Sequence, residues 1–220
     1  MSFDRAAVWE SLPIVGAGLW LTLLLVLVSL AMAVGIGLLA CAGTLLGRGA
    51  PFRASRAYVG LFRALPETVV VFWLYYCGPL ILTVKLTAFQ SATAALAIPA
   101  GAALAEIFRA GVLAVPRGHV EAARAIGLSP FWVVWDVIAP QALRIMIPAF
   151  LGLVTILIKN TALVSAIGVE ELFYRATVHA GQTFKHFELL TTVAIIYFLL
   201  IMPLSVLTQR QERRLLEKSW

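Results

Sequence analysis

The chain has 220 residues, of which 61% are hydrophobic and only 13% are charged, and its mean hydropathy is +0.95. Soluble domains average about one quarter charged residues, so this composition excludes an ordinary soluble domain and indicates a membrane protein. The formal net charge is +6. No basic stretch lies apart from the apolar runs, so this charge does not indicate a nucleic-acid partner.

Five apolar runs are long enough to cross a bilayer, which takes about 20 residues. They cover about 14–46, 57–83, 88–114, 141–168 and 188–208. Backbone groups in lipid must bond internally, so we expect each run to be a helix. The predicted fold is an all-α integral membrane protein with about five transmembrane helices in one domain, residues 1–220.

Small residues in two of these runs mark places where helices can approach closely in lipid. In the first run they are Gly16, Gly35, Gly37, Gly43 and Gly47, and in the third Ala94, Ala95, Ala102, Ala103 and Ala105. Cys41 and Cys77 both fall in predicted spans, so we interpret them as packing residues and not as a disulfide pair.

The polar insert between the third and fourth runs, about 116–140, predicts a helix, a sharp turn and a second helix. Gly118–Ile126 has good helix formers, and Gly127 suits the left-handed conformation that ends a helix. Ser129-Pro130 resembles an N-cap followed by a helical proline, and Pro140 is expected to break the second helix. The first helix would expose Ala122, Ala123 and Ile126 beside two polar anchors, Glu121 and Arg124. Such a helix fits a groove in a partner protein; a plain interfacial amphipathic helix is the alternative.

The basic residues predict the orientation, since Lys and Arg are retained on the cytoplasmic side. With five spans and the N-terminus outside, 12 of the 17 basic residues are cytoplasmic. They are Arg48, Arg53, Arg56, Arg63, Arg109, Arg117, Arg124, Arg144, Arg210, Arg213, Arg214 and Lys218. The C-terminus and the insert are then cytoplasmic.

Several motifs, in order from about Gly16 to Arg214, resemble the permeases of bacterial ABC importers. Glu121-Ala122-Ala123-Arg124-Ala125-Ile126-Gly127 is similar to their EAA loop. The other motifs are Phe62-Arg63-Ala64-Leu65-Pro66, Ala105-Glu106-Ile107-Phe108-Arg109-Ala110-Gly111, Pro140-Gln141-Ala142-Leu143-Arg144 and Lys159-Asn160-Thr161-Ala162-Leu163. Together they resemble the polar amino-acid branch of the type I importers.

This resemblance implies that the insert is the coupling helix on which separate ATPase subunits act, with Glu121, Ala122, Ala123, Arg124 and Gly127 as coupling residues. The chain has no phosphate-binding G-x-x-x-x-G-K-[ST] motif, so we expect ATP and magnesium on two partner ATPases and no cofactor or metal on this chain. The other implied partners are a second permease, with a heterodimer favoured over a homodimer, and an extracytoplasmic substrate-binding protein. The location implied is the bacterial inner membrane.

Polar residues within the predicted spans are candidates for the translocation path, because ionisable groups in lipid are costly and usually functional. Lys159, Asn160 and Thr161 are predicted midway along the fourth span, facing the path or the partner permease. The alternative is that Lys159 neutralises a buried carboxylate. Glu67 either pairs with Arg63 or meets a cationic solute, and Glu106 is expected to pair with Arg109.

The segment from Gly168 to Phe187 is predicted to form a short lateral helix on the outer side. Its polar residues, Glu170, Glu171, Tyr174, Arg175 and His179, would form the docking face for the binding protein. The three histidines have no metal-like spacing.

The predicted function is therefore ATP-driven import of a polar amino acid by alternating access. The motifs most resemble those of permeases for basic amino acids, histidine or opines. Glutamate or glutamine import is the alternative within the family. A gradient-driven transporter or channel without an ATPase is the alternative from a different class.

Overall fold

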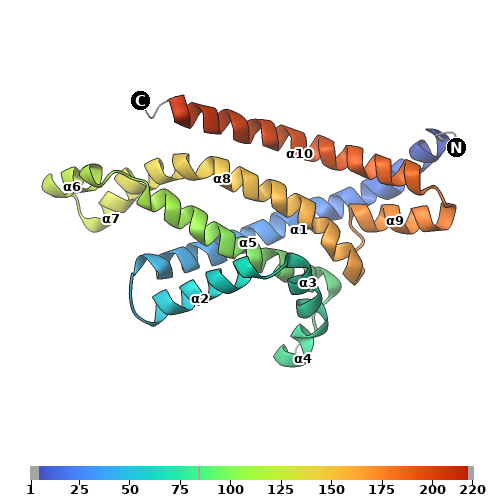
Figure 1. Cartoon of the computed structure of the whole chain (residues 1–220), viewed down its shortest axis with the longest axis horizontal. Helices are drawn as coiled ribbons and strands as arrows, with labels where there is room; N and C mark the ends of the chain where they lie inside the picture. The colour runs from blue at the N-terminus through green and yellow to red at the C-terminus, as the bar shows by residue number, and fades with distance from the viewer. Residues whose placement is uncertain (1–4, 84, 218–220) are drawn as a thin grey trace.

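A computed structural model of the chain describes residues 5–83 and 85–217, and within these ranges all regular structure is helical (Figure 1). Lys218, counted above with the cytoplasmic charges, lies outside them. The first elements are α1 (Arg5–Leu45), α2 (Ala50–Ala64), α3 (Glu67–Tyr76), α4 (Gly78–Leu82), α5 (Ala88–Leu113) and α6 (Arg117–Ala125). They are followed by α7 (Pro130–Trp132), a π-helical segment η1 (Val133–Ile138), α8 (Ala139–Asn160), a 3₁₀ segment η2 (Thr161–Ile167), α9 (Leu172–Thr183) and α10 (His186–Glu217).

Four helical stretches are long and apolar enough to cross a membrane. They cover Val8–Leu45, Ala88–Leu113, Pro130–Ile167 and His186–Arg213. The predicted span at 57–83 is wrong as a single helix, because α2 and α3 meet at an angle of 106°. Counted as one broken span, this pair gives the five crossings that the sequence predicted.

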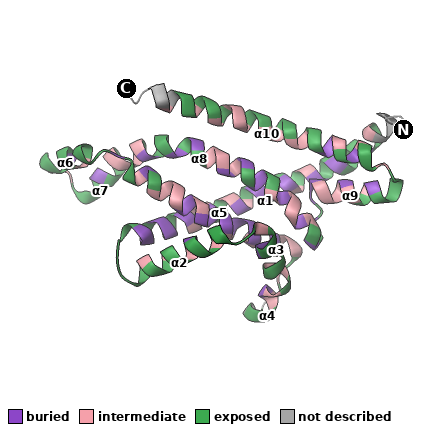
Figure 2. Ribbon diagram, in the orientation of Figure 1, coloured by how far each residue is buried: buried purple, intermediate pink, exposed green. Residues whose placement is uncertain are grey.

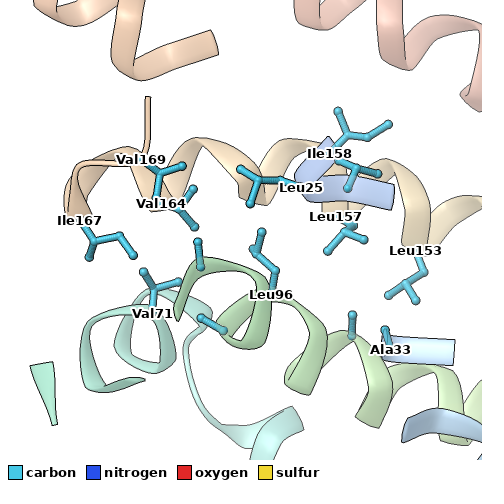
Figure 3. Close-up of a cluster of buried hydrophobic side chains, with 14 of the residues drawn as sticks. Leu25, Ala33, Val71, Leu96, Leu153, Leu157, Ile158, Val164, Ile167 and Val169 are labelled. Atoms are coloured by element: carbon cyan, nitrogen blue, oxygen red, sulfur yellow. The ribbon is translucent and has the colours of Figure 1, made fainter. Parts of the chain in front are cut away.

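The core lies where α1, α3, α5 and α8 meet. Leu25, Val71, Leu96, Leu157 and Val164 are all at most 4% exposed and converge there (Figure 3). Buried positions gather along the facing sides of α1 and α5, whereas α10 shows mainly exposed and intermediate positions along its length (Figure 2). The helices of a membrane protein bury such outer faces in lipid.

Glycines allow two of these helices to approach α1 closely. A Cβ atom on Gly37 would lie 2.7 Å from the Cβ of Leu104 on α5, and one on Gly43 would lie 2.1 Å from Ser55 Oγ on α2. The packing prediction is confirmed for these two. It is wrong for Gly16, Gly35 and Gly47, where nothing lies within 4 Å of the position a Cβ would take.

The two ends of the molecule carry different features. The N-terminus and α9 lie at one end of the long axis, while α6, α7 and the C-terminus lie towards the other (Figure 1). An odd number of crossings produces this separation of the termini.

Candidate functional site

The site begins at the break between α2 and α3. Leu65 has an extended backbone, with φ −85° and ψ 138°, because the ring of the following Pro66 disfavours a helical conformation there. Pro66 is the N-cap of α3, so Glu67 is the first residue of the new helix. The predicted Arg63–Glu67 pair does not form, because the break removes the helical i,i+4 geometry on which it depended.

Glu67 is joined instead to the end of α8. Its Oε2 atom accepts a hydrogen bond from the side-chain amide of Asn160, and both residues are half-buried. The two residues, predicted separately as path candidates, are therefore brought together by the fold. The carboxylate and the amide thus pair with each other in a half-buried position between α3 and α8.

The neighbours of Asn160 point elsewhere. Lys159 is exposed, and no carboxylate of the described residues lies within salt-bridge distance of it, so the neutralising role for Lys159 is not supported. Thr161 is fully buried, and its hydroxyl donates to the carbonyl of Ile158 at 2.8 Å. The three residues lie where α8 passes into η2, and the predicted position midway along the span is wrong.

A groove of about 730 Å³ runs between α5 and α8. Its lining is small or apolar apart from Arg63 and Glu106, and comprises Ala103, Ile107, Ala110, Gly111, Ala114, Ile145, Met146, Ala149, Gly152, Leu153 and Ile156. The spacings of three and four residues place one face of each helix on the groove. A small cavity of about 30 Å³ beside Glu67 and Asn160 shares Ala103, Leu153 and Ile156 with it. The Glu67–Asn160 pair therefore lies beside a cavity that neighbours the groove.

Arg63 and Glu106 line this groove, and Arg109 lies against Glu106. Arg109 donates two hydrogen bonds to Glu106, from Nε to Oε1 at 3.1 Å and from Nη2 to Oε2 at 3.0 Å, which confirms the predicted pair. Arg63, in the last turn of α2, approaches the same carboxylate only to 4.0 Å and keeps 58% of its side chain exposed. Two cations thus meet one anion.

A second polar cluster surrounds Glu171, which was predicted as part of an exposed docking face. That prediction is wrong for Glu171, which is fully buried. Its Oε1 atom accepts the backbone N–H of Tyr174 at 2.7 Å and caps α9, and its Oε2 atom accepts the Tyr197 hydroxyl at 3.2 Å. Burial raises the pKa of the Glu171 carboxyl above its ordinary range. Its neighbour Glu170 does lie at the surface, where it pairs with Arg175 at 2.9 Å.

The polar insert forms α6 and a tight turn, as predicted. Gly127 has φ +84°, the left-handed conformation that ends this helix. Glu121, Ala122 and Arg124 are exposed. Ala123 is only 5% exposed, so its predicted exposure is wrong. It faces the rest of the chain and holds the outward face of α6 in place.

The second half of the insert differs from the prediction. Pro140 does not break a helix; it lies where η1 runs directly into α8, and helical structure continues through it to Asn160. Next to α6, the side chains of Phe131, Trp132 and Trp135 are 49–66% exposed. Aromatic residues at the end of a span are typical of the membrane interface.

Comparison with known proteins agrees with this architecture. The family described as "Binding-protein-dependent transport system inner membrane component" matches residues 8–217. The chain is 32% identical over 216 residues to the glutamine transport system permease protein of Escherichia coli strain K12, covering 98% of this chain and 99% of that protein. It is 36% identical over 165 residues to a probable amino-acid permease protein of Bacillus subtilis strain 168, covering 72% of each.

Solved structures show the same arrangement of helices. The crystal structure of an amino acid ABC transporter with histidines matches with a TM-score of 0.87 and 30% identity, covering 97% of this chain and all of that one. An inward-facing methionine ABC transporter matches with a TM-score of 0.73 and 21% identity, covering 96% and 98%. The second likeness concerns the fold alone.

Proposed function

Since the chain belongs to the family of inner-membrane components of binding-protein-dependent transport systems and is a permease subunit of an ABC amino-acid importer, we propose that it carries glutamine. The relative from E. coli that matches almost the whole chain is a glutamine permease. It supports the alternative drawn from the sequence over the first choice of basic amino acids, histidine or opines. A basic solute remains the second candidate, because the similar crystal structure is of a transporter with histidines.

Family membership confirms the predicted all-α permease fold and separates this chain from a gradient-driven transporter. The chain is a transport subunit and not an enzyme, and ATP hydrolysis belongs to separate ATPase subunits. Nucleotide and magnesium are accordingly placed on two partner ATPases in this proposal.

The solute path runs along the groove between α5 and α8. The observation that carries this proposal is the Glu67–Asn160 hydrogen bond, which places a carboxylate and an amide beside the groove at a break in a membrane span. Breaks of this kind expose polar groups only where the backbone is shielded from lipid or lines a cavity. Glu67 and Asn160 therefore contact the solute, whereas Lys159 and Thr161 point away from it.

Coupling to ATP takes place at α6. Glu121, Ala122 and Arg124 form its outward surface and dock in a groove of an ATPase, while Ala123 and the turn at Gly127 fix that surface to the permease. The side chain of His119 contacts Gln141 in the first turn of α8 at 2.8 Å. Movement of α6 as the ATPases close would therefore reach α8, which borders the groove.

The remaining partners follow from the same arrangement. A second permease, different from this chain, covers the open side of the groove, and the binding protein docks at the surface of α9 near Glu170 and Arg175. The N-terminus lies outside and the C-terminus in the cytoplasm. This orientation is supported by the basic residues of the sequence and by the opposite positions of the termini (Figure 1).

Uptake into proteoliposomes tests this function. The chain is reconstituted with its partner permease, ATPases and binding protein, and entry of labelled L-glutamine is measured with and without ATP, in competition with unlabelled L-arginine and L-histidine. We expect ATP-dependent glutamine uptake that excess arginine leaves largely intact. Uptake of arginine or histidine in place of glutamine would assign the second candidate, and glutamine entry independent of ATP would contradict the mechanism.

A further inference from the structure

The charges beside the groove do not balance locally. Arg109 occupies both oxygens of Glu106 with hydrogen bonds of 3.0–3.1 Å. Arg63 shares that carboxylate only at 4.0 Å, beyond hydrogen-bonding distance. Its guanidinium has five N–H donors, and none of them makes a hydrogen bond with another described residue. Arg63 is thus an extra cation, still able to donate, in the wall of a groove.

An unused acceptor lies on the other side of the same break. Asn160 donates to the Oε2 atom of Glu67, while the Oε1 atom accepts no hydrogen bond from the described residues. Arg63 lies in the last turn of α2, and Glu67 begins α3. The cavity beside Glu67 and the groove beside Arg63 share Ala103, Leu153 and Ile156, so the two charges border neighbouring hollows.

From this arrangement we infer that Arg63 binds the α-carboxylate of the transported amino acid while Glu67 binds its α-ammonium, an inference that rests on the proposed function. In a free amino acid, the α-ammonium and the α-carboxylate are attached to the same carbon atom. The Glu67 carboxylate and the Arg63 guanidinium, on either side of the helix break, complement these two charges. Guanidinium groups suit carboxylates because they donate two parallel hydrogen bonds. The site would recognise the α-ammonium and the α-carboxylate, which all amino acids share, and the side chain of the solute would contact the apolar lining of the groove.

The position of Arg63 favours a role in binding the solute over a role in stabilising Glu106. The Glu106 carboxylate already has two hydrogen bonds from Arg109, so it does not need Arg63 to remain satisfied. Arg63 keeps 58% of its side chain exposed and approaches Glu106 only to 4.0 Å, so its guanidinium stays accessible to a ligand in the groove that it lines.

Direct binding to the permease–ATPase complex in nanodiscs tests the inference, with the binding protein left out so that its own affinity does not mask the site. The probes are labelled L-glutamine and L-arginine and the α-amide of each, which lacks the α-carboxylate. The variants are Arg63→Gln and Arg63→Lys. The matched control is Arg53→Gln, because Arg53 is an exposed arginine on the same helix that does not line the groove.

We expect Arg63→Gln to weaken binding of the amino acid by about tenfold or more, as for the loss of a charged hydrogen-bonding partner. Binding of the α-amide should not change, and Arg63→Lys should restore part of the affinity. Arg53→Gln should match the native chain. Equal affinities for amino acid and α-amide in the native complex would overturn the inference, as would equal effects of Arg63→Gln and Arg53→Gln, or no binding to the native complex.

Glutamine import and carboxylate binding by Arg63 can be tested independently of each other. ATP-dependent uptake by the native transporter tests the proposed function and does not depend on the Arg63 variants. If uptake occurs but the native complex shows no carboxylate-dependent binding, the inference about Arg63 is overturned and the proposed function stands.

Discussion

Asn160, the last residue of α8, donates a hydrogen bond to Glu67, the first residue of α3, across 93 positions of sequence. The next residue, Thr161, lies 3.3 Å from the Tyr197 hydroxyl, which in turn donates to Glu171. Two irregular places in the fold, the α2–α3 break and the start of α9, are therefore joined by polar contacts through the end of α8. Buried polar groups are stable only when they are paired in this way.

Glu67 is the residue whose change should affect transport most specifically. Glu67→Gln keeps the shape of the side chain and can still accept from Asn160, but it removes the charge that we propose contacts the solute. We expect uptake of glutamine to fall about tenfold or more, with the amount of assembled transporter unchanged. Glu212→Gln, an exposed change on α10, is the control; an equal loss of uptake in both variants would exclude a specific role for Glu67.

Much of this architecture could be predicted from the sequence because long apolar runs, Gly127 and the basic residues each act locally. Pro66 was visible too, but its effect on the span was not recognised, since prolines also occur inside spans; α8 contains Pro148 and continues through it. Pro140 was judged a breaker, yet helical structure continues through it from η1 into α8. Local sequence patterns thus predicted most of the helices, but the effects of Pro66 and Pro140 on them were predicted wrongly.

The site required the tertiary structure. Nothing near Glu171 in sequence indicates burial, because its partners Thr22 and Tyr197 lie on α1 and α10. Likewise, the exposure of Arg63 beside Glu106 depends on how α2 crosses α5. Residues such as these are brought together only when distant helices pack, so their roles were not predictable from spacing.

Glu171 should make stability depend on pH. Burial raises the pKa of its carboxyl, so the folded state holds the proton more tightly than the unfolded state does. Its contribution to stability is therefore complete below about pH 4.5, the ordinary value, and is lost as the pH rises through the higher folded pKa. Glu171→Gln resembles the protonated form and should remove this loss.

The measurement is the apparent melting temperature in detergent at a fixed scan rate, from pH 5 to pH 8. We expect the difference between Glu171→Gln and the native chain to grow in favour of the variant as the pH rises. Glu170→Gln, at the exposed neighbouring position, should show no such trend. A difference that does not change with pH would contradict the assignment to Glu171.

Close packing of α1 on α5 predicts opposite effects of alanine at two neighbouring glycines. Gly37→Ala places a Cβ atom 2.7 Å from that of Leu104 and should destabilise the chain by about 1–3 kcal/mol through overpacking. Gly35→Ala meets no atom within 4 Å and should stabilise the helix by up to about 1 kcal/mol. Melting temperatures of the two variants check this; a lower value for Gly35→Ala than for Gly37→Ala would refute the helix contact.

We propose that α6 couples this permease to a separate ATPase subunit. The most direct measurement is co-purification from mild detergent of a P-loop ATPase with the tagged native chain, Glu121→Arg and Glu212→Arg. Glu121→Arg reverses a charge on the exposed face of α6, and Glu212→Arg makes the same change on α10. We expect the ATPase to be retained by the native chain and by Glu212→Arg and to be lost from Glu121→Arg. Full retention by Glu121→Arg, or no ATPase with the native chain, would contradict it.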